Sequence, residues 1–322
     1  MAKRNAFILG MTILVLVFVN PISGAIMQAL RDKHALTGWK WLYLIYGACG
    51  LCPGIAGFLL LPDYPGSKHR IWWMTEDEKA CANQRMRADR VGEKSVDHGK
   101  LTIGFMDAIK DKRTWVFVLM YMSRKALDGL YVYLTPIYLD IAKQLFPKPS
   151  IDLKTLTLFI GSPPALLAAL IAFIVVYTSD RCSERTFHIA VPLMFALIGL
   201  TISAVSVNTM ARYISSYLYL GGHIAGGALM WAWVTATLQE TPEKKAIGIA
   251  IVNVVGGLGG VWSPFLFRGQ DSPWYLLAFR VLAASNLIDI TCCFVMRSIL
   301  SKMNKSLDRI SNPTERKQLY LV

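Results

Sequence analysis

Long apolar stretches alternate with short polar connections along most of the 322-residue chain. The hydrocarbon core of a bilayer is about 30 Å thick, and a helix that rises about 1.5 Å per residue crosses it in about 20 residues. Eight stretches approach or exceed this length, at about residues 6–30, 41–61, 114–142, 155–178, 187–208, 213–238, 246–267 and 274–297. The pattern predicts an all-α polytopic membrane protein with eight transmembrane helices, and no stretch resembles a transmembrane β-strand.

The first stretch also has features of a secretory signal peptide. Lys3 and Arg4 precede an apolar run over residues 6–19, and small residues follow at 23–25. The apolar character nevertheless continues to about Leu30, which is long enough for a membrane span. We therefore interpret this stretch as a transmembrane helix, with a cleaved leader as the alternative.

A connection of about fifty residues divides the predicted spans into two and six. It covers residues 63–113 and mixes acidic and basic side chains, such as the Glu76-Asp77-Glu78 run and Lys110, Lys112 and Arg113. The predicted organisation is two helices in residues 1–62, a central cytoplasmic loop in 63–113, a six-helix bundle in 114–297 and a cytoplasmic tail in 298–322.

Composition and charge set the orientation of these spans. Of all residues, 54% are hydrophobic and only 17% are charged, and the formal net charge is +13. The basic residues lie in the connections: 23 fall on the side that holds both ends and the central loop, against 8 on the other side. Because Lys and Arg concentrate on the cytoplasmic side, both ends and the central loop are predicted to face the cytosol. This distribution argues against nucleic-acid binding.

The cysteines and the known catalytic motifs point away from an enzyme. The six cysteines all fall in spans or in connections predicted to be cytoplasmic, where a disulfide framework is not expected. Cys49 and Cys52 form a CxxC inside an apolar run without a second pair or a nearby His, which favours packing residues over a metal or redox site. We find no HExxH, GxSxG or paired-Cys zinc spacing, so no cofactor and no metal are expected.

Arg124 and Asp128 are the most informative charges inside a predicted span. They lie near the centre of the 114–142 stretch, and their i,i+4 spacing predicts one shared helical face, which Tyr131 extends. A charge at mid-bilayer costs at least about 2.5 kcal/mol and persists mainly beside a cavity or a partner. Arg can bind a carboxylate with two hydrogen bonds, and a buried Asp can carry a proton. We predict a substrate or proton path here; an internal salt bridge between the two residues is the alternative.

Other polar residues inside spans carry weaker predictions. His223 lies in the middle of the 213–238 stretch, two turns before Trp231, where it could gate protons or simply pack with a hydrogen bond. Lys125 is predicted to point to a different face from Arg124. A second polar set lies in the last span: Arg280, Asn286 and Asp289. Its spacing suggests hydrogen bonds between helices as readily as transport.

Glycines predict where helices touch. The run Gly256-Gly257-Leu258-Gly259-Gly260 lies inside a span and does not follow a strand. It also lacks the Lys-Ser/Thr of a nucleotide-binding loop, so it is interpreted as a close-packing stripe between helices.

Several short motifs remain to be interpreted: Gly38-Trp39-Lys40-Trp41-Leu42-Tyr43, Leu61-Pro62-Asp63-Tyr64-Pro65, Trp73-Met74-Thr75-Glu76-Asp77-Glu78 with Arg85, Glu243-Lys244-Lys245 and Trp262-Ser263-Pro264. Together they resemble the motifs of the fungal allantoate permease family of the major facilitator superfamily. Within that family, the carriers of pantothenate, biotin and nicotinate look most similar. Asp180, Arg181 and Arg185 are similar to the superfamily's cytoplasmic loop motif after the eighth helix.

The resemblance implies an anion:cation symporter in which two six-helix halves enclose a site at the membrane midplane and expose it alternately. The eight spans would then be helices five to twelve, and the first four helices would be absent from this chain. The first, fourth, seventh and tenth helices face the cavity, which raises the weight of Arg124, Asp128 and His223 and lowers that of Arg280 and Asp289. The motif of Asp180, Arg181 and Arg185 would latch the cytoplasmic face.

Two hypotheses follow. In the first, the chain is a truncated form of a proton-coupled symporter that takes up a small organic anion or vitamin, with protons and the lipid bilayer as its other partners. In the second, it is a non-transporting membrane protein, either a remnant or an assembly partner of another carrier. The plasma membrane is the expected location, with the endoplasmic reticulum as the alternative for a truncated form.

Overall fold

The computed structural model describes residues 15, 18–19, 21–30, 37–60, 75–88, 101–147 and 152–310. Almost all of them are helical, which confirms the predicted all-α class. Besides a helical stretch over 21–29, the helices are α2 (Gly38–Leu60), α3 (Glu76–Ala88), α4 (Leu101–Lys110), α5 (Lys112–Ala126), α6 (Leu130–Leu145), α7 (Leu153–Cys182), α8 (Thr186–Val205), α9 (Thr209–Thr237), α10 (Pro242–Gly257), α11 (Gly259–Trp262) and α12 (Leu276–Ile310). Short 3₁₀ turns follow α5 (η2, Leu127–Gly129), α11 (η3, Ser263–Leu266) and η3 itself (η4, Gly269–Asp271).

Five helical segments within the described residues are long and apolar enough to cross a membrane: Gly38–Phe58, Thr155–Cys182, Thr186–Val205, Glu243–Leu266 and Leu276–Leu307. The chain is thus a polytopic membrane protein. The span expected at 114–142 is divided by η2 into α5 and α6, which run on without a gap. The span expected at 213–238 is α9, whose 29 residues exceed the length of a crossing. The first expected span lies largely outside the described residues.

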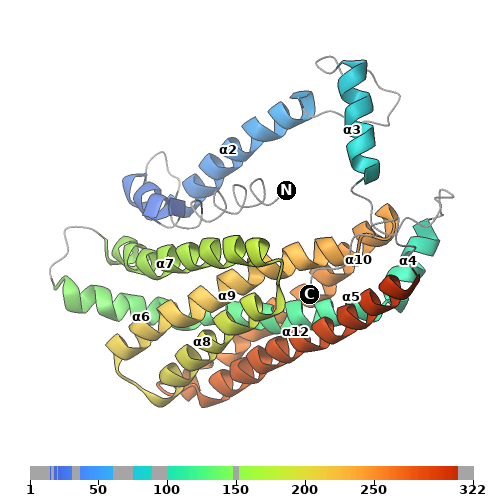
Figure 1. Cartoon of the computed structure of the whole chain (residues 1–322). Helices are drawn as coiled ribbons and strands as arrows, with labels where there is room; N and C mark the ends of the chain where they lie inside the picture. The colour runs from blue at the N-terminus through green and yellow to red at the C-terminus, as the bar shows by residue number, and fades with distance from the viewer. Residues whose placement is uncertain are drawn as a thin grey trace.

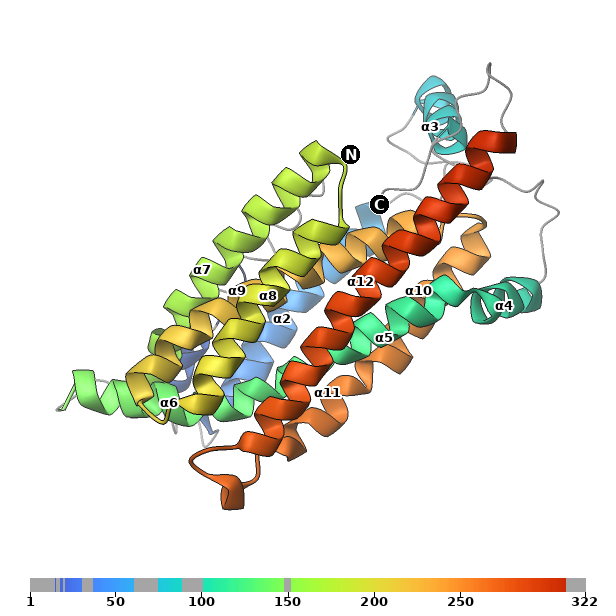
Figure 2. The ribbon, with the colours of Figure 1, turned by 60° about the horizontal axis from the view of Figure 1, so that its bottom comes forward.

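The helices from α5 to α12 form one bundle (Figures 1 and 2). Helices α7, α8 and α9 pack on one another, and α5 packs on α10 and α12. The contacts of α12 with α8 and of α6 with α7 join the two groups. In Figure 1, α2 and α3 stand outside this bundle, and the side chains of α2 are exposed or only partly covered.

Two helices of the connection expected at 63–113 are described. Helix α4 packs against α10, and a Cβ placed on Gly104 would lie 2.7 Å from Glu243 Cβ, so the small residue allows this close approach. At the other end of the bundle sequence, α12 continues to Ile310 and therefore extends into the segment expected as a tail.

Polar side chains cap the first turns of several bundle helices. Asp111 accepts a hydrogen bond from the Arg113 amide at the start of α5. Asn208 accepts from two amides at the start of α9, and Thr241 caps α10 with Pro242 in its first turn. Such caps satisfy amides that have no carbonyl partner within the helix.

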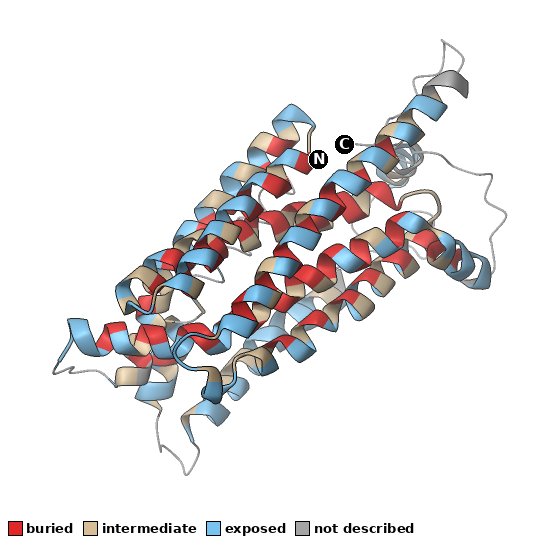
Figure 3. Ribbon diagram, turned by 90° about the horizontal axis from the view of Figure 1, so that it is seen from below, coloured by how far each residue is buried: buried red, intermediate tan, exposed pale blue. Residues whose placement is uncertain are grey.

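Two large apolar clusters fill the bundle, one toward each end of its helices, and a third, small cluster consists of Ala169, Ala172 and Ala225. The first gathers around Phe117, Trp233 and Met296, and the second around Tyr133, Tyr219 and Phe279. Figure 3 shows the buried residues facing the interior along these helices. On α5, α9 and α12 these two clusters leave a gap between them in sequence, and the buried side chains of Arg124 and Asp289 fall in this gap.

The glycine stripe predicted at 256–260 packs closely on α5. A Cβ on Gly256 would lie 2.8 Å from Tyr121 Cδ1, and one on Gly259 would overlap the Met122 carbonyl. Gly257 faces open space, so the prediction is confirmed for two of these positions and not for the third. Gly129 makes a similar contact, because a Cβ there would lie 2.6 Å from the Ser263 carbonyl oxygen.

Candidate functional site

Arg124 forms a buried ion pair in the layer between the two apolar clusters. Its Nη2 lies 2.6 Å from Asp289 Oδ2, and the two side chains are only 3% and 1% exposed. Its Nη1 donates to the His223 carbonyl at 3.0 Å. The guanidinium therefore joins α5 to α12 and to α9 at mid-depth, and the pair is electrically neutral.

Gly226 makes room for this guanidinium. A Cβ at Gly226 would lie 2.7 Å from Arg124 Nη1, which is closer than real side chains approach, whereas one at Gly227 would stay at an ordinary 3.6 Å from Arg124 Cδ. Small residues in membrane helices generally allow such close approach. Here the space is taken by a charged side chain instead of a second backbone.

The structure contradicts the alternative of a salt bridge between Arg124 and Asp128, because each side chain pairs with another residue. The 3₁₀ turn η2 begins directly after α5 and contains Asp128. In a 3₁₀ turn, residues three apart eclipse one another, whereas residues four apart do not. The tighter turn therefore sets Asp128 beside Lys125, and Arg124 faces Asp289 on another side of the helix.

Lys125, Asp128 and His223 form a second polar group. Lys125 Nζ lies 2.7 Å from Asp128 Oδ2, and His223 Nε2 lies 3.5 Å from Asp128 Oδ1. Unlike the Arg124 pair, Lys125 and Asp128 are about a third exposed, at 34% and 30%. His223 Nδ1 is buried without a hydrogen-bond partner among the described residues. Lys125 points to a different face from Arg124, as predicted, and that face also holds Asp128.

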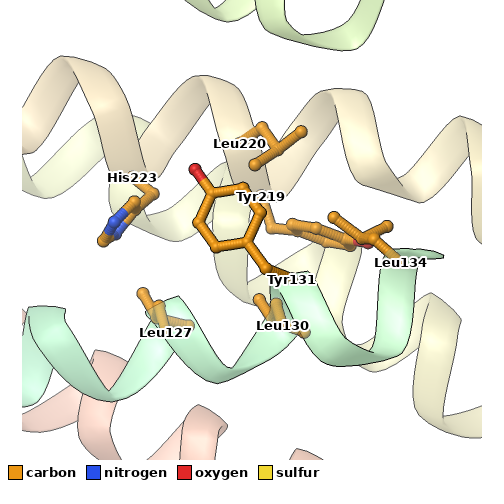
Figure 4. A pocket seen from close by; sticks show the side chains of 7 residues that line it. All are labelled: Leu127, Leu130, Tyr131, Leu134, Tyr219, Leu220 and His223. Atoms are coloured by element: carbon orange, nitrogen blue, oxygen red, sulfur yellow. The ribbon is translucent and has the colours of Figure 1, made fainter. Parts of the chain in front are cut away.

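A small pocket opens beside this group between η2, α6 and α9. His223 and Tyr131 line it, and Figure 4 shows their side chains extending into the space between the two ribbons, His223 from α9 and Tyr131 from α6. The remaining lining is mostly apolar and consists of Leu127, Leu130, Leu134, Tyr219 and Leu220. Two of the predicted site residues therefore line one pocket, and His223 links that pocket to Asp128.

Trp231 lies about two turns beyond His223 on α9. Its ring packs edge-on against Tyr121, with centroids 4.9 Å apart, and Lys125 Nζ lies 5.7 Å from the centre of the Tyr121 ring. An ammonium over an aromatic face is attracted electrostatically. Four of the predicted residues therefore lie on three neighbouring elements: Asp128 on η2, Tyr131 on α6, and His223 and Trp231 on α9.

The last helix contributes differently from the prediction. Asp289, which the family resemblance placed on a peripheral helix, is the partner of Arg124. Asn286 is 1% exposed, and neither atom of its amide has a hydrogen-bond partner among the described residues. Arg280 lies on the exposed surface of α12. The i,i+3 spacing of Asn286 and Asp289 was a real signal, but it could not reveal which helix Asp289 would face.

The motif of Asp180, Arg181 and Arg185 lies where α7 turns into α8. Arg185 Nη2 donates to Asp180 Oδ1 at 2.8 Å, and Arg185 is buried while Arg181 is exposed. Glu184 binds His188 and also reaches Arg297 of α12 at 3.2 Å. Two of the three predicted residues therefore form an ion pair, and Glu184 ties the same corner to α12.

A second ion-pair cluster, formed by Asp111, Arg113, Glu240 and Lys244, was not predicted. Lys244 Nζ lies 2.7 Å from both Asp111 Oδ2 and Glu240 Oε2, and Arg113 binds the same two carboxylates. Burial opposes the charge on Asp111 and Glu240, but the hydrogen bonds from Lys244 and Arg113 outweigh it and hold both pKa values below their usual range. The cluster joins the start of α5 to the connection between α9 and α10. The sequence signal for this cluster is weak: acidic and basic residues lie just before the predicted span at 114–142 and between the predicted spans at 213–238 and 246–267.

Comparisons with known proteins point to one superfamily. The family model described as "Major Facilitator Superfamily" matches residues 1–264. A protein of Agrobacterium vitis named "Putative tartrate transporter" is 29% identical over 263 residues, which are 82% of this chain and 54% of that protein. The "Major facilitator-type transporter hxnP" of Emericella nidulans is 25% identical over 313 residues, or 96% of this chain and 60% of that protein.

A bacterial relative gives the same result. The "Inner membrane transport protein RhmT" of Escherichia coli is 25% identical over 254 residues, which are 79% of this chain and 54% of that protein. This chain therefore spans little more than half of the length of these relatives. All three are named as transporters, which agrees with the expectation that the chain is not an enzyme.

Proposed function

The chain belongs to the Major Facilitator Superfamily, and from that premise we propose that it serves as a proton-coupled transporter of a small organic anion. Transport would proceed by alternating access, in which two bundles rock around a site near the membrane midplane. The motifs quoted above favour the anion:cation symporters of the allantoate permease family. The comparisons do not favour a non-transporting membrane protein.

One observation carries the proposal: a charged, partly exposed group lies at mid-depth beside a pocket. Lys125 and Asp128 are neither fully buried nor on the cytoplasmic or external surface, and His223 extends from them to the pocket. Ionisable residues at this depth are costly and are typical of substrate and proton pathways. The ammonium of Lys125 can bind a carboxylate, and the carboxylate of Asp128 together with the imidazole of His223 can bind and transfer a proton.

The predicted residues receive distinct roles in this proposal. Asp128 and His223 handle the proton, Tyr131 and Trp231 border the substrate, and Arg124 holds α5 against α9 and α12. The "Putative tartrate transporter" supports a carboxylate as the substrate class, and the family resemblance supports a vitamin such as nicotinate or pantothenate. The ion pair of Asp180 and Arg185, with Arg181 beside it, would latch the cytoplasmic face. The plasma membrane is the proposed location.

Uptake assays test the proposal. Cells that lack endogenous carriers would express the protein as its gene encodes it and would receive radiolabelled nicotinate, pantothenate or tartrate. We expect accumulation of at least one compound and loss of accumulation when a protonophore collapses the proton gradient. Absence of uptake for all three, with the protein present at the membrane, would contradict organic-anion transport. Accumulation that ignores the protonophore would contradict proton coupling alone.

A further inference from the structure

We propose that Lys125 is the cation that binds the carboxylate of the substrate, and that Asp128 releases Lys125 for this purpose by taking up a proton. The inference rests on the proposed function and names the residue that gives the site its anion preference. The sequence analysis predicted only that Lys125 points to a different face from Arg124, and it expected Arg124 to hold the anion.

Arg124 is not available to bind an anion. Its guanidinium already binds Asp289 at 2.6 Å and the His223 carbonyl at 3.0 Å, and its side chain is buried. A substrate that took Arg124 away from Asp289 would leave an unpaired carboxylate in the most buried part of the bundle, which is strongly unfavourable. Arg124 is therefore a positioning residue, which fixes α9 and hence His223 relative to α5.

Lys125 is reachable and has one principal partner. Its ammonium binds Asp128 at 2.7 Å, and a third of the side chain is exposed. The face around it carries aromatic rings that can flank a small planar anion, Tyr121 before it and Tyr131 after it. On the α11 side, a Cβ on Gly260 would lie 3.7 Å from Asp128 Oδ2 and 3.9 Å from Lys125 Cδ, so the glycine leaves that side uncrowded.

The groups that face Asp128 define how it can exchange a proton. From α5 the neighbour is Lys125, and from α9 it is His223, whose Nε2 lies 3.5 Å from Oδ1. From α11 Gly260 approaches, Tyr131 of α6 interacts electrostatically with Asp128, and α12 acts through the neutral pair of Asp289 with Arg124. The two oxygens of Asp128 therefore have separate tasks, one toward the ammonium and one toward the imidazole.

Charge balance couples the two events. With Asp128 ionised, the Lys125 pair is neutral, so an incoming monoanion would leave one uncompensated negative charge at mid-membrane. If Asp128 binds a proton, its oxygen gives up the ammonium, Lys125 donates to the substrate carboxylate, and the site is neutral again. One proton enters for each monoanion, and no net charge moves. Release of the anion lets Lys125 return to Asp128 and expels the proton.

Four variants test this assignment in proteoliposomes that contain the protein as its gene encodes it. Lys125→Ala removes the proposed anion contact, Lys125→Arg keeps a cation, and Asp128→Asn fixes the neutral form. Lys143→Ala is the matched control, because Lys143 forms an exposed pair three residues from Asp140 in α6, 3.8 Å apart. Initial uptake of radiolabelled nicotinate, pantothenate and tartrate is measured together with proton entry by a pH-sensitive dye.

For whichever compound the unmodified protein accumulates, we expect Lys125→Ala to raise KM about 10- to 100-fold, the range expected for a lost hydrogen bond to a charged group. Lys125→Arg should restore part of this loss, and Lys143→Ala should match the unmodified protein. Asp128→Asn should still exchange external for internal substrate, but without proton entry and with a flat rate between pH 5 and pH 8. For nicotinate or pantothenate, the unmodified protein should take in one proton per molecule.

The outcomes separate the two proposals. An unmodified protein that transports none of the three compounds contradicts the proposed function, and the inference falls with it. An active unmodified protein whose KM is unchanged by Lys125→Ala contradicts the inference alone. So does an Asp128→Asn variant that still couples proton entry to uptake. Because Asp128→Asn must remain active in exchange, misfolding cannot be mistaken for support.

Discussion

Asp289 of α12 lies 2.6 Å from Arg124 of α5, across 165 residues of sequence, and both side chains are almost fully buried. This pair occupies the layer between the two apolar clusters of the bundle. It neutralises Arg124, the least exposed of the buried Arg and Lys side chains of the described residues, and it ties α12 to α5. The more exposed pair of Lys125 and Asp128 is thereby left as the one that a solute can reach.

Loss of Asp289 should be strongly destabilising. Asp289→Ala would leave the Arg124 guanidinium buried without a counter-charge, and breaking one side of a buried pair costs about 3–5 kcal/mol. We expect a clear loss of folded protein, measured as a lower midpoint of thermal unfolding in detergent. The double variant Arg124→Met with Asp289→Leu should recover most of that loss, because it removes both charges.

An exposed pair provides the comparison. Asp140→Ala in α6 removes the partner of Lys143, and both side chains are more than half exposed. Exposed ion pairs contribute about 0–1 kcal/mol, so the unfolding midpoint should barely move. If Asp289→Ala were as mild as Asp140→Ala, the buried pair could not be the element that holds α12 against α5.

Gly226 should tolerate no side chain. A Cβ would lie 2.7 Å from Arg124 Nη1, and overpacking in a filled core typically costs about 1–3 kcal/mol. Gly226→Ala should therefore lower the unfolding midpoint. Gly257→Ala is the matched control in α10, because nothing lies within 4 Å of a Cβ there. At that position alanine should be neutral or slightly stabilising, by up to about 1 kcal/mol.

The fold class could be predicted from the sequence because the bilayer imposes a simple rule. Apolar stretches of about 20 residues must be helices that satisfy their own backbone groups, and α7, α8 and α12 begin and end within a few residues of the expected spans, apart from the continuation of α12 to Ile310. Close packing at Gly256 and Gly259 was likewise predictable, because a run of glycines within a span has few other uses.

The partners inside the site could not be predicted in the same way. The i,i+4 rule that joined Arg124 to Asp128 assumes an unbroken α-helix, and a 3₁₀ turn at Leu127 changes the face of each side chain. The true partner, Asp289, depends on how α12 packs, which no local spacing encodes. The residues with the right chemistry were identified, but the pairs among them follow from the tertiary structure.

The ion-pair cluster of Asp111, Arg113, Glu240 and Lys244 predicts a specific pH dependence. Asp111 and Glu240 have pKa values held below their usual range, so their ion pairs stabilise the folded protein above about pH 4, the ordinary range of carboxyl groups. That stability should stay constant from pH 5 to pH 8 and should be lost as pH falls through the lowered values. Asp111→Asn should cost about 1.5–3 kcal/mol at pH 7, the range for hydrogen bonds to charged groups.

Thermal unfolding at several pH values checks this prediction. The difference in stability between the unmodified protein and Asp111→Asn should be the same at pH 5.5 and pH 8, and it should shrink at pH 4 and below. A difference that instead changes between pH 6 and pH 8 would mean that another group, such as a histidine, controls this end of the bundle.

Arg185 and Arg181 should differ sharply in importance, although both belong to the same loop motif. Arg185 is buried and binds Asp180 at 2.8 Å, whereas Arg181 is exposed. In the proposed transport cycle the ion pair of Asp180 and Arg185 is made in only one of the two alternating states. Arg185→Ala removes a charge-assisted hydrogen bond worth about 1.5–3 kcal/mol, so the balance between these states should shift about tenfold or more. We expect uptake to fall accordingly in Arg185→Ala and to change less than twofold in Arg181→Ala at equal surface expression. Equal losses in the two variants would show that the motif acts through its positive charge, for example toward lipid headgroups, and not through the latch proposed for Arg185 and Asp180.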